Sequence, residues 1–321
     1  MTDRLETKTG NNSVRMVEID AGSDGQRIDN FLLRELKGVP KSRIYNLLRR
    51  GEVRVNKGRV KAEHRLSVGD VVRIPPIRMA ESAGAGPSVS AALSDRLAEA
   101  VLFEDEGLLV IDKPSGLAVH GGSGVNLGLI EALRAMRPQA KFLELVHRLD
   151  RDTSGCIMVA KKRSALLALH EALRGDGVDK RYLALAAGTW PRHRARIEVP
   201  LEKNTLRSGE RVVRVSMEGK PALTEFKVLE SFSIATLIEA SPITGRTHQI
   251  RVHAQYAGHP LAGDEKYGDN AANARFRELG LRRLFLHAYA LSFEWQGRRL
   301  QLQSELPEDL ISFLAVLRNS L

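Results

Sequence analysis

Two carboxylates and several basic side chains are crowded into one short stretch of this chain. Residues 145–155 read Leu-Val-His-Arg-Leu-Asp-Arg-Asp-Thr-Ser-Gly, and an apolar run, Cys156–Ala160, follows at once. A run of this length, bounded by glycine and by Lys161-Lys162, is typical of a buried strand. A carboxylate at the mouth of a core strand needs partners, because burying an unpaired charge is costly. Asp150 is therefore a candidate reacting group, and a charged turn in solvent is the plain alternative.

A second polar cluster lies at residues 242–251 and contains Arg246 and Thr247. Thr247 is a favourable N-cap for a helix over Ile250–Tyr256, which would place Arg246 just before a helix N-terminus, where anions bind. An arginine within a few ångströms of a carboxylate orients it and lowers its pKa. We therefore expect Arg246 to pair with Asp150.

Other chemistries fit these residues less well. The nine histidines form no His-x-x-x-His pair with an added carboxylate, so no metal site is expected. Asp150, Asp152 and Thr153 approximate the motif of aspartate-nucleophile phosphatases, but Thr153 stands one position early and His147-Arg148 replaces the buried apolar strand before that motif. The two aspartates could also be a glycosidase acid and base, but a turn over 151–155 breaks the required geometry.

Positive charge is concentrated near the N-terminus. The formal net charge of the 321 residues is +10, and the segment from Gly25 to Arg78 holds 14 Lys or Arg against 5 Asp or Glu. A nearly neutral body with one basic segment favours a dedicated nucleic-acid-binding module. The basic residues that we expect to bind RNA lie on two short predicted helices and a following strand: Arg27, Lys41, Arg43, Arg49, Arg50 and Arg54.

The composition also bears on where the protein works. The single cysteine, Cys156, allows no internal disulfide and fits a reducing cytoplasm. The first twenty residues have no apolar segment typical of a signal peptide, and no run of about 18 apolar residues occurs that could cross a membrane. We therefore expect a cytoplasmic protein that has no contact with membranes.

Four parts are predicted along the chain. Residues 1–13 form a polar, disordered tail, 14–78 the basic module, 79–98 a flexible linker rich in Ala, Gly, Ser and Pro, and 99–321 a larger body. In the body, helical and strand patterns are mixed without strict alternation. This pattern predicts an α+β fold with a large mixed, mainly antiparallel sheet flanked by helices and loops. Its predicted strands are 101–105, 108–112, 156–160, 181–185, 212–215, 223–228, 234–238 and 284–288, and its predicted helices are 130–136, 164–173, 250–256 and one that starts at Pro307.

The basic module resembles the small RNA-binding domain known as the alpha-L motif. The resemblance rests on Gln26–Leu32, Lys41–Arg43 and Gly51–Asn56, and it covers residues 25–75. It implies that the module binds structured RNA through its helical face.

The body resembles the RluA-type pseudouridine synthases. His147–Gly155 matches their central motif, Lys180–Ala184 looks like their second motif and Gly245–Arg251 like their third. The segments Asp112–Gly116, with His120, and Leu286–Ala288 also match. Several motifs in the right order argue against chance agreement.

This resemblance implies an isomerase that converts uridine to pseudouridine in 23S rRNA, either free or within the assembling large subunit. It also implies a monomer that needs no cofactor. Asp150 would then be the catalytic nucleophile or base, Tyr182 would stack on the base and take its C5 proton, and Arg246 would complete the catalytic set. The target base must leave its helix or loop, and Arg148 could fill the vacated place. The other residues expected to bind substrate are His147, Arg151, Thr247, His248, Ile250 and Arg251.

Two alternatives remain open at this point. The chain could be a non-catalytic RNA-binding or assembly factor that kept the fold, although such a protein would have no need of Asp150. It could also be a magnesium-dependent phosphatase. Without the resemblance, Arg251 is typical of a surface or RNA-contact residue, and His147 of a residue that braces its loop.

Overall fold

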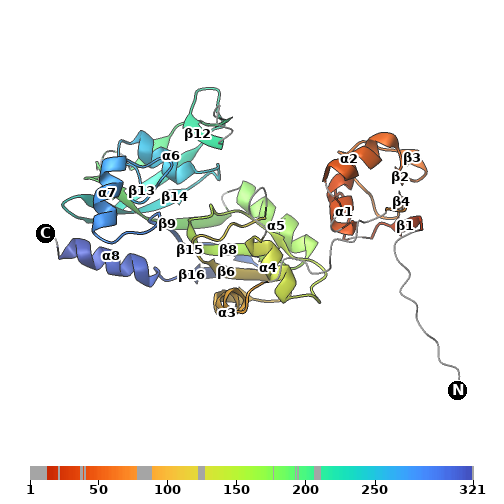
Figure 1. Cartoon of the computed structure of the whole chain (residues 1–321), viewed down its shortest axis with the longest axis horizontal. Helices are drawn as coiled ribbons and strands as arrows, with labels where there is room; N and C mark the ends of the chain where they lie inside the picture. The colour runs from red at the N-terminus through yellow and green to blue at the C-terminus, as the bar shows by residue number, and fades with distance from the viewer. Residues whose placement is uncertain are drawn as a thin grey trace, which may run out of the picture. The chain divides into compact units, whose positions relative to one another are not determined.

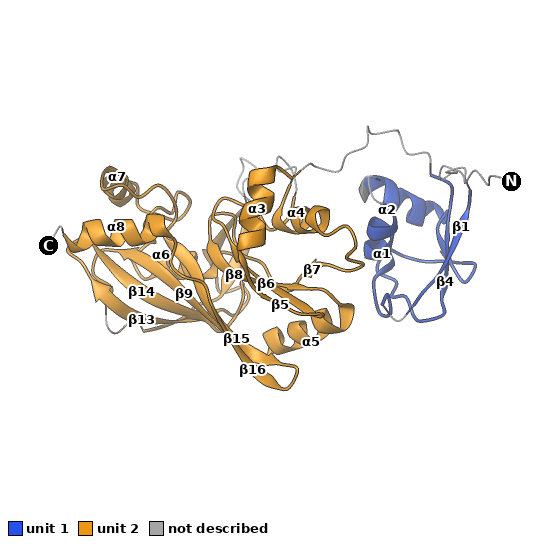
Figure 2. Ribbon diagram, turned by 90° about the horizontal axis from the view of Figure 1, so that it is seen from below, with its two compact units in different colours: residues 1–86 blue, residues 87–321 orange. Residues whose placement is uncertain are grey.

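The computed structural model describes residues 13–20, 22–36, 39, 41–77, 89–121, 127–175, 177–191, 193, 195–205 and 211–319. It separates into two compact units, residues 1–86 and 87–321 (Figure 2). The predicted tail, except for its last residue, and the first ten residues of the predicted linker, 79–88, lie outside the described residues. No helix in the described ranges is long and apolar enough to cross a membrane.

The first unit packs two helices against a four-stranded sheet with the order β1-β4-β2-β3. Its core is a single apolar cluster in which Phe31 and Leu32 of one helix meet Ile44 and Leu47 of the other. Asn56 and Lys57 both have positive φ, 48° and 66°, which suits the tight hairpin turn between β2 and β3. The elements are β1 Arg15–Glu18, α1 Ile28–Glu35, α2 Lys41–Arg50, β2 Arg54–Val55, β3 Gly58–Arg59 and β4 Val71–Ile74.

The second unit is built on a ten-stranded sheet in which β15 and β8 form the one parallel pair among the described strands (Figure 1). The order along the sheet is β10-β13-β14-β9-β15-β8-β6-β5, with β16 beside β15 and β7 beside β8. The strands are β5 Val101–Glu104, β6 Leu108–Lys113, β7 Glu144–Leu145, β8 Ser154–Ala160, β9 Val178–Ala187, β10 Arg196–Glu198, β13 Leu223–Ser231, β14 Ala235–Pro242, β15 Leu286–Trp295 and β16 Arg298–Gln303. A separate hairpin is formed by β11 Leu201–Thr205 and β12 Arg211–Val215.

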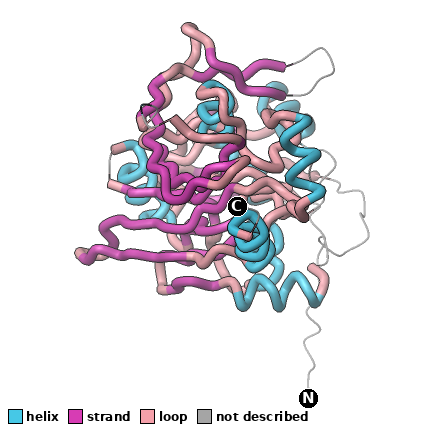
Figure 3. The backbone as a smooth tube through the Cα atoms, turned by 90° about the vertical axis from the view of Figure 1, so that its left-hand side faces the viewer, coloured by secondary structure: helices cyan, strands magenta, loops and turns pink. Residues whose placement is uncertain are grey.

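Helices cover both faces of this sheet, and the tube view shows them on more than one side of the strands (Figure 3). Helices α3 Ala91–Glu99 and α4 Leu129–Met136 pack on the face that carries Ile157, whereas α5 Arg163–Arg174 packs on the face that carries Met158. All seven residues of β8 are therefore buried, as expected for a strand covered on both sides. The remaining helices, packed on the other half of the sheet, are α6 Gln249–Tyr256, α7 Asn270–Glu278 and α8 Glu308–Arg318.

The predicted α+β class with a mixed, mainly antiparallel sheet is confirmed. The prediction of a flexible linker over 79–98 is wrong in its second half, because Ala91–Glu99 forms α3. Ser90 caps that helix by accepting a hydrogen bond from the Leu93 backbone N–H, and Leu97 is fully buried against α4. The small residues that suggest a linker by composition here form the start of a helix whose one buried residue is Leu97.

Candidate active site

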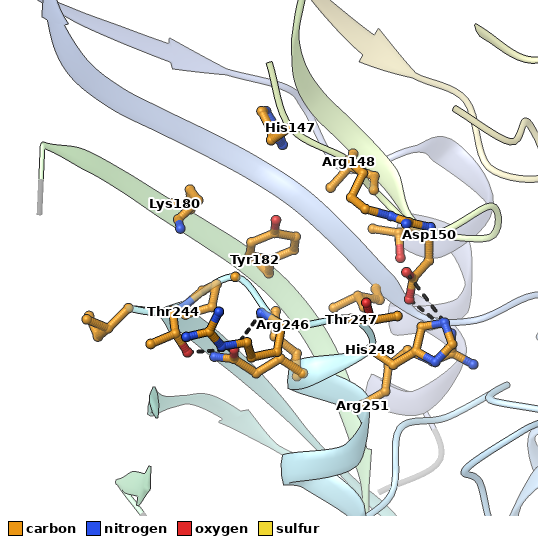
Figure 4. Close-up of a pocket in the computed structure, with 18 of the residues that line it drawn as sticks. His147, Arg148, Asp150, Lys180, Tyr182, Thr244, Arg246, Thr247, His248 and Arg251 are labelled. Atoms are coloured by element: carbon orange, nitrogen blue, oxygen red, sulfur yellow. Dashed lines mark hydrogen bonds and ion pairs between the residues drawn. The ribbon is translucent and has the colours of Figure 1, made fainter. Parts of the chain in front are cut away.

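A pocket of about 500 Å³ opens in the second unit where three segments meet (Figure 4). The segments are the loop between β7 and β8, strand β9, and the loop that leads into α6. Asp150 is the one carboxylate among the residues that line the pocket. Five lining residues are basic, so the pocket suits an anionic ligand that meets a single carboxylate. They are Arg148, Arg174, Lys180, Arg246 and Arg251.

The carboxylate of Asp150 is held by a buried arginine. Its Oδ2 accepts a hydrogen bond from Arg251 Nη1 at 3.0 Å, and its Oδ1 lies 3.7 Å from His248 Nε2. Arg251 in turn donates from Nε and Nη2 to Asp264, at 2.7 and 2.8 Å. Burial alone would lower the pKa of Arg251, but Asp264 and Asp150 raise it well above its usual value. The guanidinium thus stays charged and orients Asp150.

The expected pair between Arg246 and Asp150 is wrong. Arg246 is exposed, and its Nε donates to the Pro221 carbonyl oxygen at 3.0 Å. Arg251 is only 8% exposed, so its interpretation as a surface residue is also wrong, whereas its role in binding substrate stays a prediction. The two arginines flank the same turn, and the start of α6 at Gln249 directs Arg251, not Arg246, toward the carboxylate.

Gln249 fixes the loop before α6. Its Oε1 accepts hydrogen bonds from Thr244 Oγ1 at 2.6 Å and from the Arg246 backbone N–H at 2.9 Å. Its Nε2 donates to the Leu223 carbonyl and to Thr224 Oγ1, both at 2.9 Å. A buried amide with all these partners ties the loop to β13.

The predicted N-cap at Thr247 is wrong. The N-cap is His248, which has a left-handed backbone with φ 54° and makes no side-chain capping bond. The side chain of Thr247 instead lines the pocket. The helix therefore begins without the usual hydroxyl cap.

Lys113 anchors the loop between β7 and β8 that carries Asp150, here called the Asp150 loop. It is fully buried at the end of β6. Its ammonium donates to the carbonyl oxygens of Pro114, Leu117 and Arg151, at 2.9, 2.8 and 3.0 Å. Burial lowers the pKa of Lys113 to about 7, while the nearby carboxylates oppose this shift. Three carbonyl acceptors match the three donors of an ammonium group, so Lys113 joins the loop that follows β6 to the loop that carries Asp150.

Gly155 lets β8 approach β15 closely behind the same loop. Its φ is +109°, and a Cβ at this position would lie 2.3 Å from the Ala288 carbonyl oxygen. Only glycine fits this combination, so the turn that ends the Asp150 loop requires it.

Tyr182 lies in the pocket between two groups of side chains, with Lys180 and His147 on one side and Asp150 on the other (Figure 4). Burial and the nearby Asp150 raise the pKa of its hydroxyl, so the phenol is neutral at neutral pH. His147 accepts a hydrogen bond from the Met158 backbone N–H at 3.1 Å, and burial lowers its pKa to about 4. His147 thus braces the loop as a neutral ring.

The other predicted site residues differ in position. Arg148 is exposed at the pocket, and Ile250 is buried in the core beside it. Arg151 is exposed and pairs with Asp152 at 3.1 Å, and it is not among the residues that line the pocket. Its backbone carbonyl, rather than its side chain, serves the site through Lys113.

In the first unit, the predicted RNA-binding residues include several with partners of their own. Arg27 pairs with buried Asp29 at 2.7 Å, and Arg54 donates to the Gly51 carbonyl at 3.2 Å. The side chain of Lys41 lies outside the described residues. The remaining three, Arg43, Arg49 and Arg50, are exposed on α2.

Sequence reasoning missed four residues that shape the site: Lys113, Gln249, Asp264 and Tyr267. The first two lie inside the segments that carry the resemblance, so they could have been examined there. Asp264 and Tyr267 lie in a loop between α6 and α7 with no signal beyond their residue types. Tyr267 is buried beside Arg251, whose guanidinium carbon lies 5.0 Å from the ring centre.

The geometry supports nucleophilic or base chemistry by one carboxylate. Asp150 is oriented by a charged guanidinium, stands near an aromatic ring and faces a cationic pocket. The described residues contain no group of three or more His, Cys, Asp or Glu that could hold a metal ion.

The chain is similar to known proteins of one family. Residues 107–256 match the model of the RNA pseudouridylate synthase family, and residues 26–72 match the S4 domain. Ribosomal large subunit pseudouridine synthase C of Haemophilus influenzae is 57% identical over 322 residues, covering 100% of both chains. The protein of the same name from Escherichia coli K12 is 56% identical and covers 98% of this chain and 99% of its own length.

A solved structure is also similar to this chain. The human RNA pseudouridylate synthase domain containing 4 is 30% identical, with a TM-score of 0.60, and covers 71% of this chain and 96% of its own. Sequence identity over the full length and the matched family model together establish that this chain belongs to the RNA pseudouridylate synthase family.

Proposed function

We propose that this enzyme, a pseudouridine synthase and thus an isomerase, converts uridines of 23S rRNA to pseudouridine with Asp150 as the reacting group. The proposal for the substrate rests on the relatives named above, whose names place their action on the large ribosomal subunit. The proposal for the chemistry rests on one observation. Asp150 is the single carboxylate of a cationic pocket, and the buried Arg251 fixes its orientation.

The reaction breaks the bond between N1 of uracil and C1′ of the ribose and forms a bond between C5 and C1′. C5 loses a proton and N1 gains one, so the atoms balance without a redox partner. Asp150 acts as nucleophile or base in this exchange, and it must be ionised to do so. Arg251 favours the ionised form because its charge lies 3.0 Å from Oδ2.

Tyr182 is positioned to stack on the uracil ring while the base turns. Its hydroxyl is neutral at neutral pH, as that of an ordinary tyrosine is, and burial and Asp150 raise its pKa further, so the ring can approach the carboxylate without charge repulsion. The phenol oxygen then accepts the C5 proton while its own proton passes through solvent to N1, the position that gains a proton in the reaction. Arg148, exposed beside Asp150, fills the place of the flipped base.

The S4 domain and the basic pocket contribute to RNA affinity in different ways. Exposed arginines on α2 contact phosphates without reading the base, whereas the pocket selects a base that can leave its helix. We propose 23S rRNA, free or in the assembling subunit, as the partner.

The test is incubation of the purified protein with 23S rRNA carrying tritium at C5 of uridine. We expect tritium release in proportion to pseudouridines mapped at discrete sites, both unchanged by excess chelator. Absence of release from free rRNA and from large-subunit precursors alike would refute the proposal. Loss of activity in chelator would instead favour a metal-dependent reaction.

A further inference from the structure

His248 stands between the reacting carboxylate and a buried hydroxyl. Its Nδ1 lies 2.7 Å from the Tyr267 hydroxyl oxygen, and its Nε2 lies 3.7 Å from Asp150 Oδ1. Oδ2 of Asp150 is already occupied by Arg251. The imidazole therefore faces the one carboxylate oxygen that Arg251 leaves open.

The hydrogen bonds around Tyr267 determine which nitrogen of His248 carries the proton. The Tyr267 oxygen accepts a hydrogen bond from the Val213 backbone N–H at 2.9 Å. A backbone N–H cannot accept, so the hydroxyl proton of Tyr267 points to its other neighbour, Nδ1 of His248. Because Nδ1 accepts, the neutral ring carries its proton on Nε2, toward Asp150.

The opposite tautomer would be disfavoured at both ends of the ring. It would leave the Tyr267 hydroxyl proton without an acceptor among the described neighbours, and it would place the lone pair of Nε2 against a carboxylate.

Burial lowers the pKa of His248, and the charged groups that act on it are Asp150, Arg251, Asp264 and Lys266. The ring is thus neutral at neutral pH.

The backbone of His248 holds the ring in this place. His248 is one of four residues other than glycine with positive φ among the described residues. A left-handed conformation is uncommon for such residues and is associated with functional sites. Here it places the imidazole between Asp150 and Tyr267, and the Tyr267 hydroxyl in turn contacts β12.

We propose that His248 is a positioning residue that donates a hydrogen bond from Nε2 to Oδ1 of Asp150 when substrate binds, and that Tyr267 fixes the required tautomer. This inference rests on the proposed role of Asp150 as the reacting group. A distance of 3.7 Å is longer than a hydrogen bond, and such contacts often tighten only in the complex. With Arg251 on Oδ2 and His248 on Oδ1, the rotation of the carboxylate is fixed, which fixes the lone pair that faces the substrate.

Hydrogen bonds link the site to the hairpin β11–β12. Val213 belongs to β12, so its N–H, the Tyr267 hydroxyl, His248 and Asp150 form one chain of polar groups. A shift of this hairpin would break the hydrogen bond from the Val213 N–H to the Tyr267 oxygen. The Tyr267 hydroxyl could then accept from His248 Nδ1, and the Nε2 proton that faces Asp150 would be lost.

Two substitutions at position 248 separate positioning from structure. His248→Asn keeps a residue that tolerates the left-handed backbone and a polar atom at the level of Nδ1, but it has nothing at the level of Nε2. His248→Gln extends an amide N–H to the level of Nε2. We expect the Asn variant to lower the single-turnover rate of pseudouridine formation roughly 10- to 100-fold with RNA affinity unchanged within about twofold, and the Gln variant to recover part of that loss.

A spectroscopic measurement tests the tautomer without reference to activity. In the intact protein labelled with ¹⁵N-histidine, the His248 signals, assigned by their absence in the Asn variant, should report a proton on Nε2. Tyr267→Phe should shift the ring toward a mixture of tautomers. A proton on Nδ1 in the unsubstituted protein, or an Asn variant with an unchanged single-turnover rate, would overturn the proposal. If the unsubstituted protein forms no pseudouridine, the proposed function fails, and the tautomer result stands or falls separately.

Discussion

Asp264→Asn tests whether a residue outside the pocket controls the orientation of the Asp150 carboxylate. Asp264 is 1% exposed and accepts two hydrogen bonds from Arg251, plus backbone N–H bonds from Lys266 and Tyr267 on Oδ1. If the amide oxygen of asparagine keeps the backbone bonds, its NH₂ group faces Arg251 Nε, and two donors oppose each other. Arg251 Nη2 can still donate to the amide oxygen, but the partly exposed Asp150 is then the one charged partner left to this buried cation.

The magnitude follows from the burial. Removing one partner of a buried ion pair costs about 3–5 kcal/mol. For a unit of this size each kcal/mol lowers Tm by roughly 2–4 °C, so Tm should fall by about 6–20 °C. Where the variant is still folded, the rate of tritium release should fall roughly 10- to 100-fold, because Asp150 loses its fixed orientation.

The neighbouring residue offers a matched control. Glu265→Gln removes the same charge one position along, but Glu265 is exposed and pairs with exposed Arg277 at 3.0 Å. Its effect on stability should be within about 0.5 kcal/mol. Thermal unfolding by calorimetry and single-turnover assays below the transition compare the two variants. A Tm change below about 2 °C for Asp264→Asn, with an unchanged rate, would refute the assigned role of Arg251.

Three further outcomes are expected. Arg246→Gln should weaken RNA binding by about 3- to 10-fold, with the saturating rate nearly unchanged, because Arg246 is exposed and does not hold Asp150; a loss of rate as large as that of an Asp150 variant would contradict this. Burial lowers the pKa of His253 to about 4, so the folded state binds fewer protons than the unfolded state between about pH 4 and 6.5. The free energy of unfolding should therefore decrease as the pH is lowered through this range, by up to roughly 1.4 kcal/mol per pH unit for this group. Urea unfolding should show a shallower loss for His253→Gln over that range, and parallel curves would count against it. Deleting residues 1–78 should reduce the slope of log affinity against log salt while leaving turnover of a short substrate largely intact; equal slopes in both proteins would be inconsistent with an RNA-binding S4 domain.

Much of the second unit followed from periodicity, because its strands lie in the core and its helices have one apolar face. The hairpin 101–112 and the buried strand at 156–160 are examples in which local pattern and final structure agree. The S4 hairpin was predictable only in part, since Asn56 is of a type that tolerates positive φ, whereas Lys57, which also has positive φ, is not. In contrast, α3 was missed because one buried leucine, Leu97, gives too weak a periodic signal.

The site was predictable in its composition but not in its pairing. Sequence motifs indicated Asp150 and an arginine, yet the choice between Arg246 and Arg251 depends on where α6 begins, and the cap that decides this is His248 in an uncommon backbone conformation. Asp264 acts through Arg251 from a loop with no regular pattern. Lys113 acts through backbone carbonyls, which leave no trace in residue types. Long-range hydrogen bonds of this kind require the structure.

The central claim is that Asp150 is the reacting group of a 23S rRNA pseudouridine synthase. The most direct measurement compares the unsubstituted protein with Asp150→Asn on 23S rRNA tritiated at C5 of uridine, under single-turnover conditions with binding measured in parallel. The Asn variant keeps the size of the side chain and can still accept from Arg251, so RNA affinity should change little while tritium release falls by on the order of 1,000-fold or more. Tritium release at the unsubstituted rate would contradict the assignment of Asp150 as the reacting residue.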